Sequence, residues 1–173
     1  MQESFPPKSP TESSQPQIGQ AAMQDSQLTQ AYKAAGSNFY NIAVFSLINS
    51  VINLFQIRIY FPIGLGVTQI IDSIAFIVGR DAPEARIVFL IIGLVINLII
   101  FGIVALFGLF IGKRTGWLIP LGGALYLLDG LLLLAFSDWI GAAFHGYFLY
   151  RIFAAWQAVR SVEKTNLPSA IGI

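Results

Sequence analysis

The stretch from Ile87 to Gly112 contains no Lys, Arg, Asp, Glu or His over 26 residues. A helix needs about 20 apolar residues to cross a bilayer, so this stretch is long enough to span one. Charged residues make up 11% of the chain and hydrophobic residues 55%, whereas about 25% of the residues in a soluble domain are charged. The sequence therefore predicts an integral membrane protein rather than an ordinary water-soluble fold.

The chain contains five apolar segments, of which this stretch is the third, and all of them are expected to be helices. Membrane β-barrel strands alternate apolar and polar residues over about ten positions, and runs such as LIIGLVINLIIFGIV contain no such alternation. The predicted fold class is therefore all-α, an integral membrane helical bundle with four to five transmembrane segments. The segments cover residues 37–55, 61–78, 87–111, 117–136 and 139–156.

Polar sequence flanks the predicted bundle on both sides. Residues 1–32 hold four of the eight prolines among many Ser, Gln and Thr residues, a composition too poor in large apolar groups to offset the entropy of folding. We expect a disordered polar N-terminal tail over 1–32, a transmembrane helical bundle over 33–158 and a short C-terminal tail over 159–173.

The second segment leaves the number of spans open. Asp72 costs about 3 kcal/mol at the centre of a bilayer, which nearly cancels the gain from the apolar residues around it. Without this segment, four spans place seven basic residues on one side and three on the other, which the positive-inside rule assigns to cytoplasmic termini. If the second segment crosses, six basic residues lie on one side and four on the other, and the N-terminus lies outside. The first arrangement is preferred, with the segment lying in the interface or dipping into the membrane. Its seven and three residues are Lys8, Lys33, Lys113, Arg114, Arg151, Arg160 and Lys164 against Arg58, Arg80 and Arg86.

Two connectors carry helix-start patterns. Asp81-Ala-Pro-Glu84 has the form of a capping box with Pro83 in the first turn, which predicts the start of the third helix. Ser137 and Asp138 are expected to cap the fifth helix.

Polar residues inside the apolar segments are the candidate functional residues. At 100° per residue they form seams on the helices, and a polar group facing lipid would stay unpaired, so each seam should face the bundle interior. Small and amide residues serve such bundles as packing devices, as Gly108-x-x-x-Gly112 would. Ionisable groups within a membrane, however, mark ion or proton pathways by default. The candidate intramembrane polar site consists of Asp72, Asp129, His145, Gln69, Asn49 and Asn53. A buried Asp129 has two further interpretations, as a protonated acid or as a structural pair with His145 or Arg151.

Several function classes are disfavoured. A net charge of +1 offers no concentrated basic face for nucleic acid. The chain has no cysteine and one histidine, so a thiolate or His-rich metal site is excluded, and no cofactor is implied. An Asp72/Asp129 carboxylate dyad is the remaining enzymatic arrangement, but neither residue carries the flanking motif expected of an intramembrane aspartyl protease. We expect no enzymatic activity.

The polar motifs resemble those of an uncharacterised family of small bacterial polytopic membrane proteins. The resemblance covers residues 37–153 and implies a bacterial inner-membrane location, but no activity or functional residues. It rests on GLGVTQIID (64–72), Gly116-Trp117, LYLLDG (125–130), DWIGAAFH (138–145) and Tyr150.

Two functions remain as expectations. The first is a structural, accessory or oligomeric membrane component, surrounded by the lipid bilayer and packed against a second copy or another membrane protein. The alternative is a small proton- or solute-translocating protein that uses the buried Asp and His residues.

Overall fold

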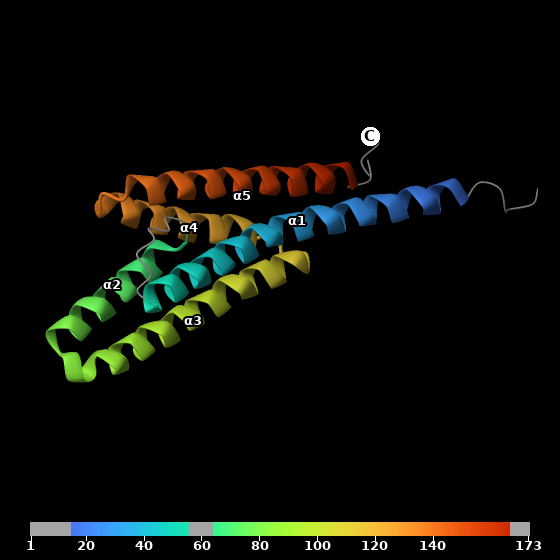
Figure 1. The fold of residues 1–173 in the computed structure, drawn as a ribbon. Coiled ribbons are helices and arrows are strands. Elements are labelled where there is room, and N and C mark those ends of the chain that lie inside the picture. The colour runs from blue at the N-terminus through green and yellow to red at the C-terminus, as the bar shows by residue number, and fades with distance from the viewer. Residues whose placement is uncertain (1–14, 56–63, 167–173) are drawn as a thin grey trace, which may run out of the picture.

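The computed structural model describes residues 15–55 and 64–166, and this part of the chain is helical with no strand, which confirms the all-α prediction. Figure 1 shows its five α-helices. They are α1 (Gln15–Leu54), α2 (Gly66–Asp81), α3 (Arg86–Gly112), α4 (Leu118–Ala135) and α5 (Trp139–Asn166), and a 3-10 turn, η1 (Pro83–Ala85), separates α2 from α3.

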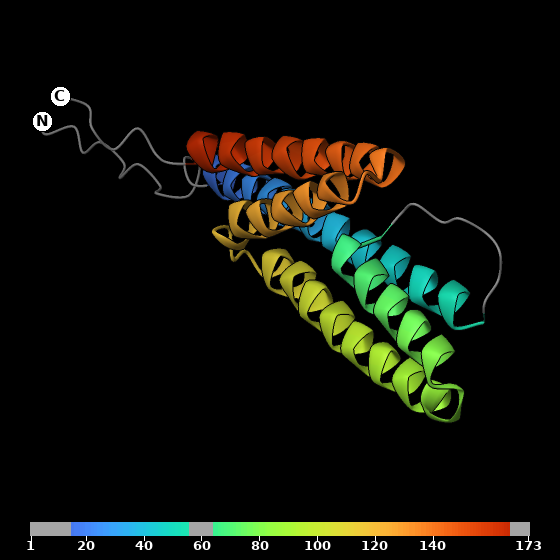
Figure 2. The same cartoon turned by 90° about the vertical axis from the view of Figure 1, so that its left-hand side faces the viewer.

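Four of the helices run along the bundle in alternating directions. α1 packs against both α3 and α5, and α4 packs against α5. The first turns of α1 and the last turns of α5 lie at the same end of the bundle, whereas the turn between α4 and α5 lies at the other (Figures 1 and 2). Figure 2 also shows α2 and α3 side by side and inclined to α4 and α5.

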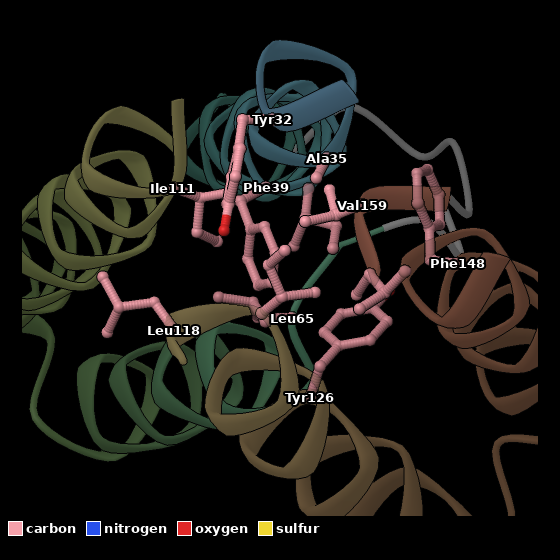
Figure 3. Packing of buried hydrophobic residues seen from close by; sticks show 12 residues of the cluster. Tyr32, Ala35, Phe39, Leu65, Ile111, Leu118, Tyr126, Phe148 and Val159 are labelled. Atoms are coloured by element: carbon pink, nitrogen blue, oxygen red, sulfur yellow. The ribbon is translucent and has the colours of Figure 1, made fainter. Parts of the chain in front are cut away.

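Buried aromatic and aliphatic side chains fill the space between α1, α4 and α5. Figure 3 shows Phe39, Leu65 and Tyr126 pointing into this space, with Phe148 on its α5 side. Phe45 contributes an edge-on contact with Phe148 at a ring-centroid distance of 6.1 Å. The apolar core therefore lies where the start of α2 enters the bundle.

α2 begins inside the bundle and does not run along its full length. The Leu65 amide donates to Ser46 Oγ at 2.8 Å. The start of α2 therefore lies beside Ser46 of α1 (Figure 1). A Cβ on Gly79, near the end of α2, would lie 2.9 Å from Arg86 Cγ at the start of α3. α2 therefore ends beside the start of α3, beyond the last turn of α1 (Figure 1).

The polar tails predicted at the two ends of the chain are partly helical. Residues 15–32 are helical, and so are residues 159–166. The later part of the first stretch packs on the second, whereas residues 19–27 are exposed. Tyr32 and Val159 are buried, and the Tyr32 hydroxyl donates to Glu163 Oε1. The apolar face of this part of α1 consists of Leu28, Ala31, Tyr32 and Ala35, spaced i, i+3, i+4 and i+7 as a helix requires. Residues 1–14 and 167–173 of the predicted tails lie outside the described part.

One predicted cap is present and the other is wrong. The Gly141 amide donates to Asp138 Oδ1 at 2.9 Å, so Asp138 caps α5 as expected. Asp81 instead ends α2 and pairs with Arg80 at 3.1 Å. Pro83 begins a 3-10 turn, and α3 begins only at Arg86 without a side-chain cap. The short turn takes up the residues that the capping box would have placed in the helix.

α1 and α3 approach each other through glycines. A Cβ on Gly36 would lie 2.5 Å from the Gly108 carbonyl oxygen and 3.2 Å from the Gly112 amide nitrogen. Small residues permit such backbone contact between helices. The predicted packing role is confirmed for Gly108, where a Cβ would lie 2.9 Å from the Gly36 carbonyl oxygen, but not for Gly112, where a Cβ would meet nothing within 4 Å.

By length and composition, the described residues include two helical stretches that are long and apolar enough to cross a membrane, Pro83–Gly112 and Leu118–Ala135. α1, α2 and α5 do not meet both criteria, so the predicted number of four to five spans stays a prediction.

Candidate functional site

The Asp129 carboxylate joins three helices. It projects from α4 and accepts the Gly66 amide at 2.7 Å on Oδ2 and the Val67 amide at 2.9 Å on Oδ1. His145 Nε2, on α5, lies 2.8 Å from the same Oδ2. Leu65 precedes α2 and provides no side-chain cap, so Asp129 takes the capping position from another helix. A carboxylate is favoured there because helix N-terminal amides are unpaired and carry partial positive charge.

The His145 ring is held on one face and at both of its nitrogens. His145 is only 1% exposed, and the ring Nδ1 lies 3.0 Å from the Gly141 carbonyl oxygen, one turn earlier in α5. The Tyr126 ring stacks on it at a centroid distance of 4.3 Å and an interplanar angle of 13°. A Cβ on Gly130 would lie 3.1 Å from His145 Cβ, so this glycine allows the close approach of α5 to α4.

Asp72 belongs to a second polar group. Asn97 Nδ2 donates to Asp72 Oδ1 at 2.6 Å and to Ser50 Oγ at 2.9 Å, which ties α2, α3 and α1 together. Asn97 and Ser50 are buried. Asp72 lies six residues beyond Gly66, or about 9 Å further along α2 at 1.5 Å per residue. The two carboxylates therefore bind different partners, and they do not form the dyad that an aspartyl protease requires.

The remaining candidates are amides. Asn49 is buried, and its Nδ2 has no hydrogen-bond partner among the described residues. Gln69 Nε2 is buried without a partner in the same part of the chain. The side chain of Asn53 lies outside the described residues. Among the five predicted residues whose side chains the structure describes, Asp129 and His145 are the pair joined by a hydrogen bond.

An apolar recess adjoins the Asp129 contact. It has a volume of about 180 Å³ and lies between α1, α3, α4 and the start of α2. Phe39, Ile103, Phe107 and Leu125 line it, and Asp129 is the only charged residue among those that do. Because Asp129 is already hydrogen-bonded to α2 and α5, the recess presents an almost wholly apolar surface.

Sequence analysis missed several partners in these two groups. Asn97 is a lone amide in a long apolar run, and this isolation is the signal that would have placed it in the site. Ser50 lies one helical turn after Ser46, on the side of α1 that meets α2. The Gly66 and Val67 groups are backbone amides, for which the side-chain pattern gives no signal.

Within the described residues, no three His, Asp or Glu side chains lie close enough together to hold a metal ion. Comparisons with protein-family models, with curated proteins and with solved structures find no match to this chain. Functional inference therefore rests on the geometry of the two polar groups.

Proposed function

We propose that the chain is an integral membrane protein in which α1, α3, α4 and α5 cross the bilayer and α2 is re-entrant. The length of the α3 and α4 stretches supports this arrangement. So does the path of α2, because backbone that breaks its helix at membrane depth is tolerated where protein buries it, and Gly64, Leu65 and Gly66 are buried. The seven-to-three distribution of basic residues assigns both chain ends to the cytoplasm. The resemblance of the motifs favours a bacterial inner membrane.

The topology is testable because the chain lacks cysteine. Gln20→Cys in α1 and Glu84→Cys in η1 place single thiols at opposite ends of the bundle. In sealed, right-side-out vesicles, a membrane-impermeant thiol reagent should label Glu84→Cys and reach Gln20→Cys only after permeabilisation. Labelling of both variants, or of Gln20→Cys alone, before permeabilisation would contradict the proposed topology.

We propose that the protein acts as a non-enzymatic structural or accessory component of the membrane. The observation that carries this proposal is the use of each carboxylate within the bundle to join helices. Asp129 links α4 to α2 and α5, and Asp72 links α2 to α3 through Asn97, which also binds Ser50 of α1.

An accessory role requires a partner, and the outward face of α3 is the surface that would bind one. Ile91, Leu98 and Ile99 are each more than half exposed on this helix. Native mass measurement in lipid nanodiscs should give an oligomer or a complex, which Ile99→Trp should weaken. Leu131→Trp, on the exposed side of α4, is the matched control. A strictly monomeric particle without partners would refute the accessory role.

The second candidate is a proton- or solute-translocating protein. It is favoured by a specific observation, a helix that begins inside the bundle with its first amides bound to an Asp–His pair. Transporters place the ends of broken helices at their binding sites in this way. The test compares proton and solute flux in vesicles for the wild type, Asp129→Asn and Asp72→Asn. Flux that is absent from all three, or equal in all three, removes this candidate.

A further inference from the structure

The hydrogen bonds of His145 require one proton more than a neutral ring can supply. The Gly141 carbonyl oxygen can only accept a hydrogen bond, so Nδ1, which lies 3.0 Å from it, must carry a hydrogen. A neutral imidazole has a single N–H, and this contact uses it. Nε2 nevertheless lies 2.8 Å from Asp129 Oδ2, and two acceptors without a proton between them would repel each other.

We propose that the Asp129–His145 contact is a proton-binding site, in which one bound proton makes His145 an imidazolium paired with an ionised Asp129. The ligand is the proton itself, and the site is built from α4, α5 and the first turn of α2. This inference holds whether the bundle serves as a scaffold or as a conduit, because it concerns only the number of protons on the pair.

The contacts of both partners place the proton on the ring. Asp129 Oδ2 also accepts the Gly66 amide, and Oδ1 accepts the Val67 amide. Both bonds favour the ionised carboxylate, as does the N-terminal end of the α2 dipole. On the other partner, the face of the Tyr126 ring lies against the imidazole at 4.3 Å. An aromatic face attracts a cation, so this stacking favours imidazolium.

The surrounding elements supply few other titratable groups. α4 contributes Tyr126, and α5 contributes Asp138, whose carboxylate is hydrogen-bonded to the Gly141 amide. The first turn of α2 faces the pair with backbone amides, and α1 and α3 line the adjoining recess with apolar side chains. Among the described residues, the ion pairs found do not give His145 a second acidic partner.

Loss of the proton would break one of the two contacts of the ring. A ring that keeps its Nδ1 hydrogen turns a lone pair toward the carboxylate, whereas a ring that moves the hydrogen to Nε2 loses the Gly141 bond. The first form loses the hydrogen bond between α5 and the Asp129 carboxylate, and the second keeps that bond but loses the one to Gly141. The bound proton thus lets the His145 ring make both contacts at once, with the carboxylate that also accepts the first amides of α2.

The test uses the single histidine of the chain. In full-length protein labelled with [15N]histidine in lipid nanodiscs, every imidazole signal comes from His145. Nitrogen shifts and N–H couplings at neutral pH should report hydrogens on both ring nitrogens. Asp129→Asn should convert the ring to a neutral form with its hydrogen on Nδ1. The matched control is Asp72→Asn, which removes the other carboxylate within the bundle and should leave both hydrogens on the ring.

Two results would overturn the inference. One is a wild-type ring with a single N–H at neutral pH, whichever nitrogen carries it. The other is loss of the second hydrogen in Asp72→Asn as well as in Asp129→Asn. The wild-type spectrum is decisive alone if a variant fails to fold. Because the measurement follows the ring and not transport, absence of flux would leave the inference standing.

Discussion

Replacing Asp129 with alanine removes an acceptor used by three donors, those of Gly66, Val67 and His145. If the three bonds were ordinary side-chain bonds in a membrane bundle, at about 0.6 kcal/mol each, the loss would be about 2 kcal/mol. Removing one partner of a buried ion pair costs more, about 3 to 5 kcal/mol. We therefore expect Asp129→Ala to lower the free energy of unfolding by at least about 3 kcal/mol, or roughly 100-fold in the folding equilibrium at 1.4 kcal/mol per factor of ten.

The assay is reversible unfolding in mixed micelles, combined with hydrogen exchange at the start of α2. Asp129→Asn keeps the side-chain volume and one acceptor oxygen but leaves at least one donor without an acceptor, so its loss should be smaller, about 1 to 3 kcal/mol. Asp81→Ala is the surface control, because its exposed pair with Arg80 is worth less than about 1 kcal/mol. The Gly66 and Val67 amides should exchange faster in Asp129→Ala than in Asp81→Ala. A loss below about 1 kcal/mol with unchanged exchange of both amides would refute the capping role of Asp129.

Gly36→Ala would place a Cβ 2.5 Å from the Gly108 carbonyl oxygen and should lower the free energy of unfolding by about 1 to 3 kcal/mol. Gly102→Ala, with nothing within 4 Å, is its control, and equal effects would contradict the helix contact. Burial, followed by the hydrogen bond to Glu163, raises the pKa of Tyr32 from 10.0 to about 12. The contribution of the neutral Tyr32 phenol to the free energy of unfolding is therefore fully present below pH 10. It is lost as the pH rises through about 12. The phenolate absorbance lost in Tyr32→Phe should titrate near pH 12 in the wild type. In Glu163→Gln it should titrate at a lower pH that is still above 10, because burial of the phenol remains; titration near 10 in the wild type would contradict this.

Helix positions follow from the sequence where one physical signal dominates. The third segment was predicted over 87–111, and α3 spans Arg86–Gly112. The fourth was predicted over 117–136, and α4 spans Leu118–Ala135. Both are long apolar runs between polar turns, and such runs are satisfied in lipid only as helices. The early part of α1 was missed because its polar composition hid the spacing of its four apolar residues.

The candidate site could be predicted only in part. The rarity of ionisable groups in apolar segments identifies Asp72, Asp129 and His145, and a pairing of Asp129 with His145 was among the alternatives. Their separation into two groups could not be predicted, because it depends on where α2 enters the bundle. That position is set by two backbone amides, because the Leu65 amide donates to the Ser46 hydroxyl and the Gly66 amide donates to the Asp129 carboxylate. Neither contact leaves a periodic signature in the chain.

α1 is a single helix of 40 residues, about 60 Å long at 1.5 Å per residue and twice the thickness of a hydrocarbon core. Near the middle of the helix Tyr32 binds α5, and 14 residues further along Ser46 binds the backbone that starts α2. No break separates these two points. In the proposed topology, α1 therefore couples its cytoplasmic end rigidly to the start of α2. A displacement of that end also displaces Ser46, which binds the Leu65 amide, because no break in the helix absorbs the motion.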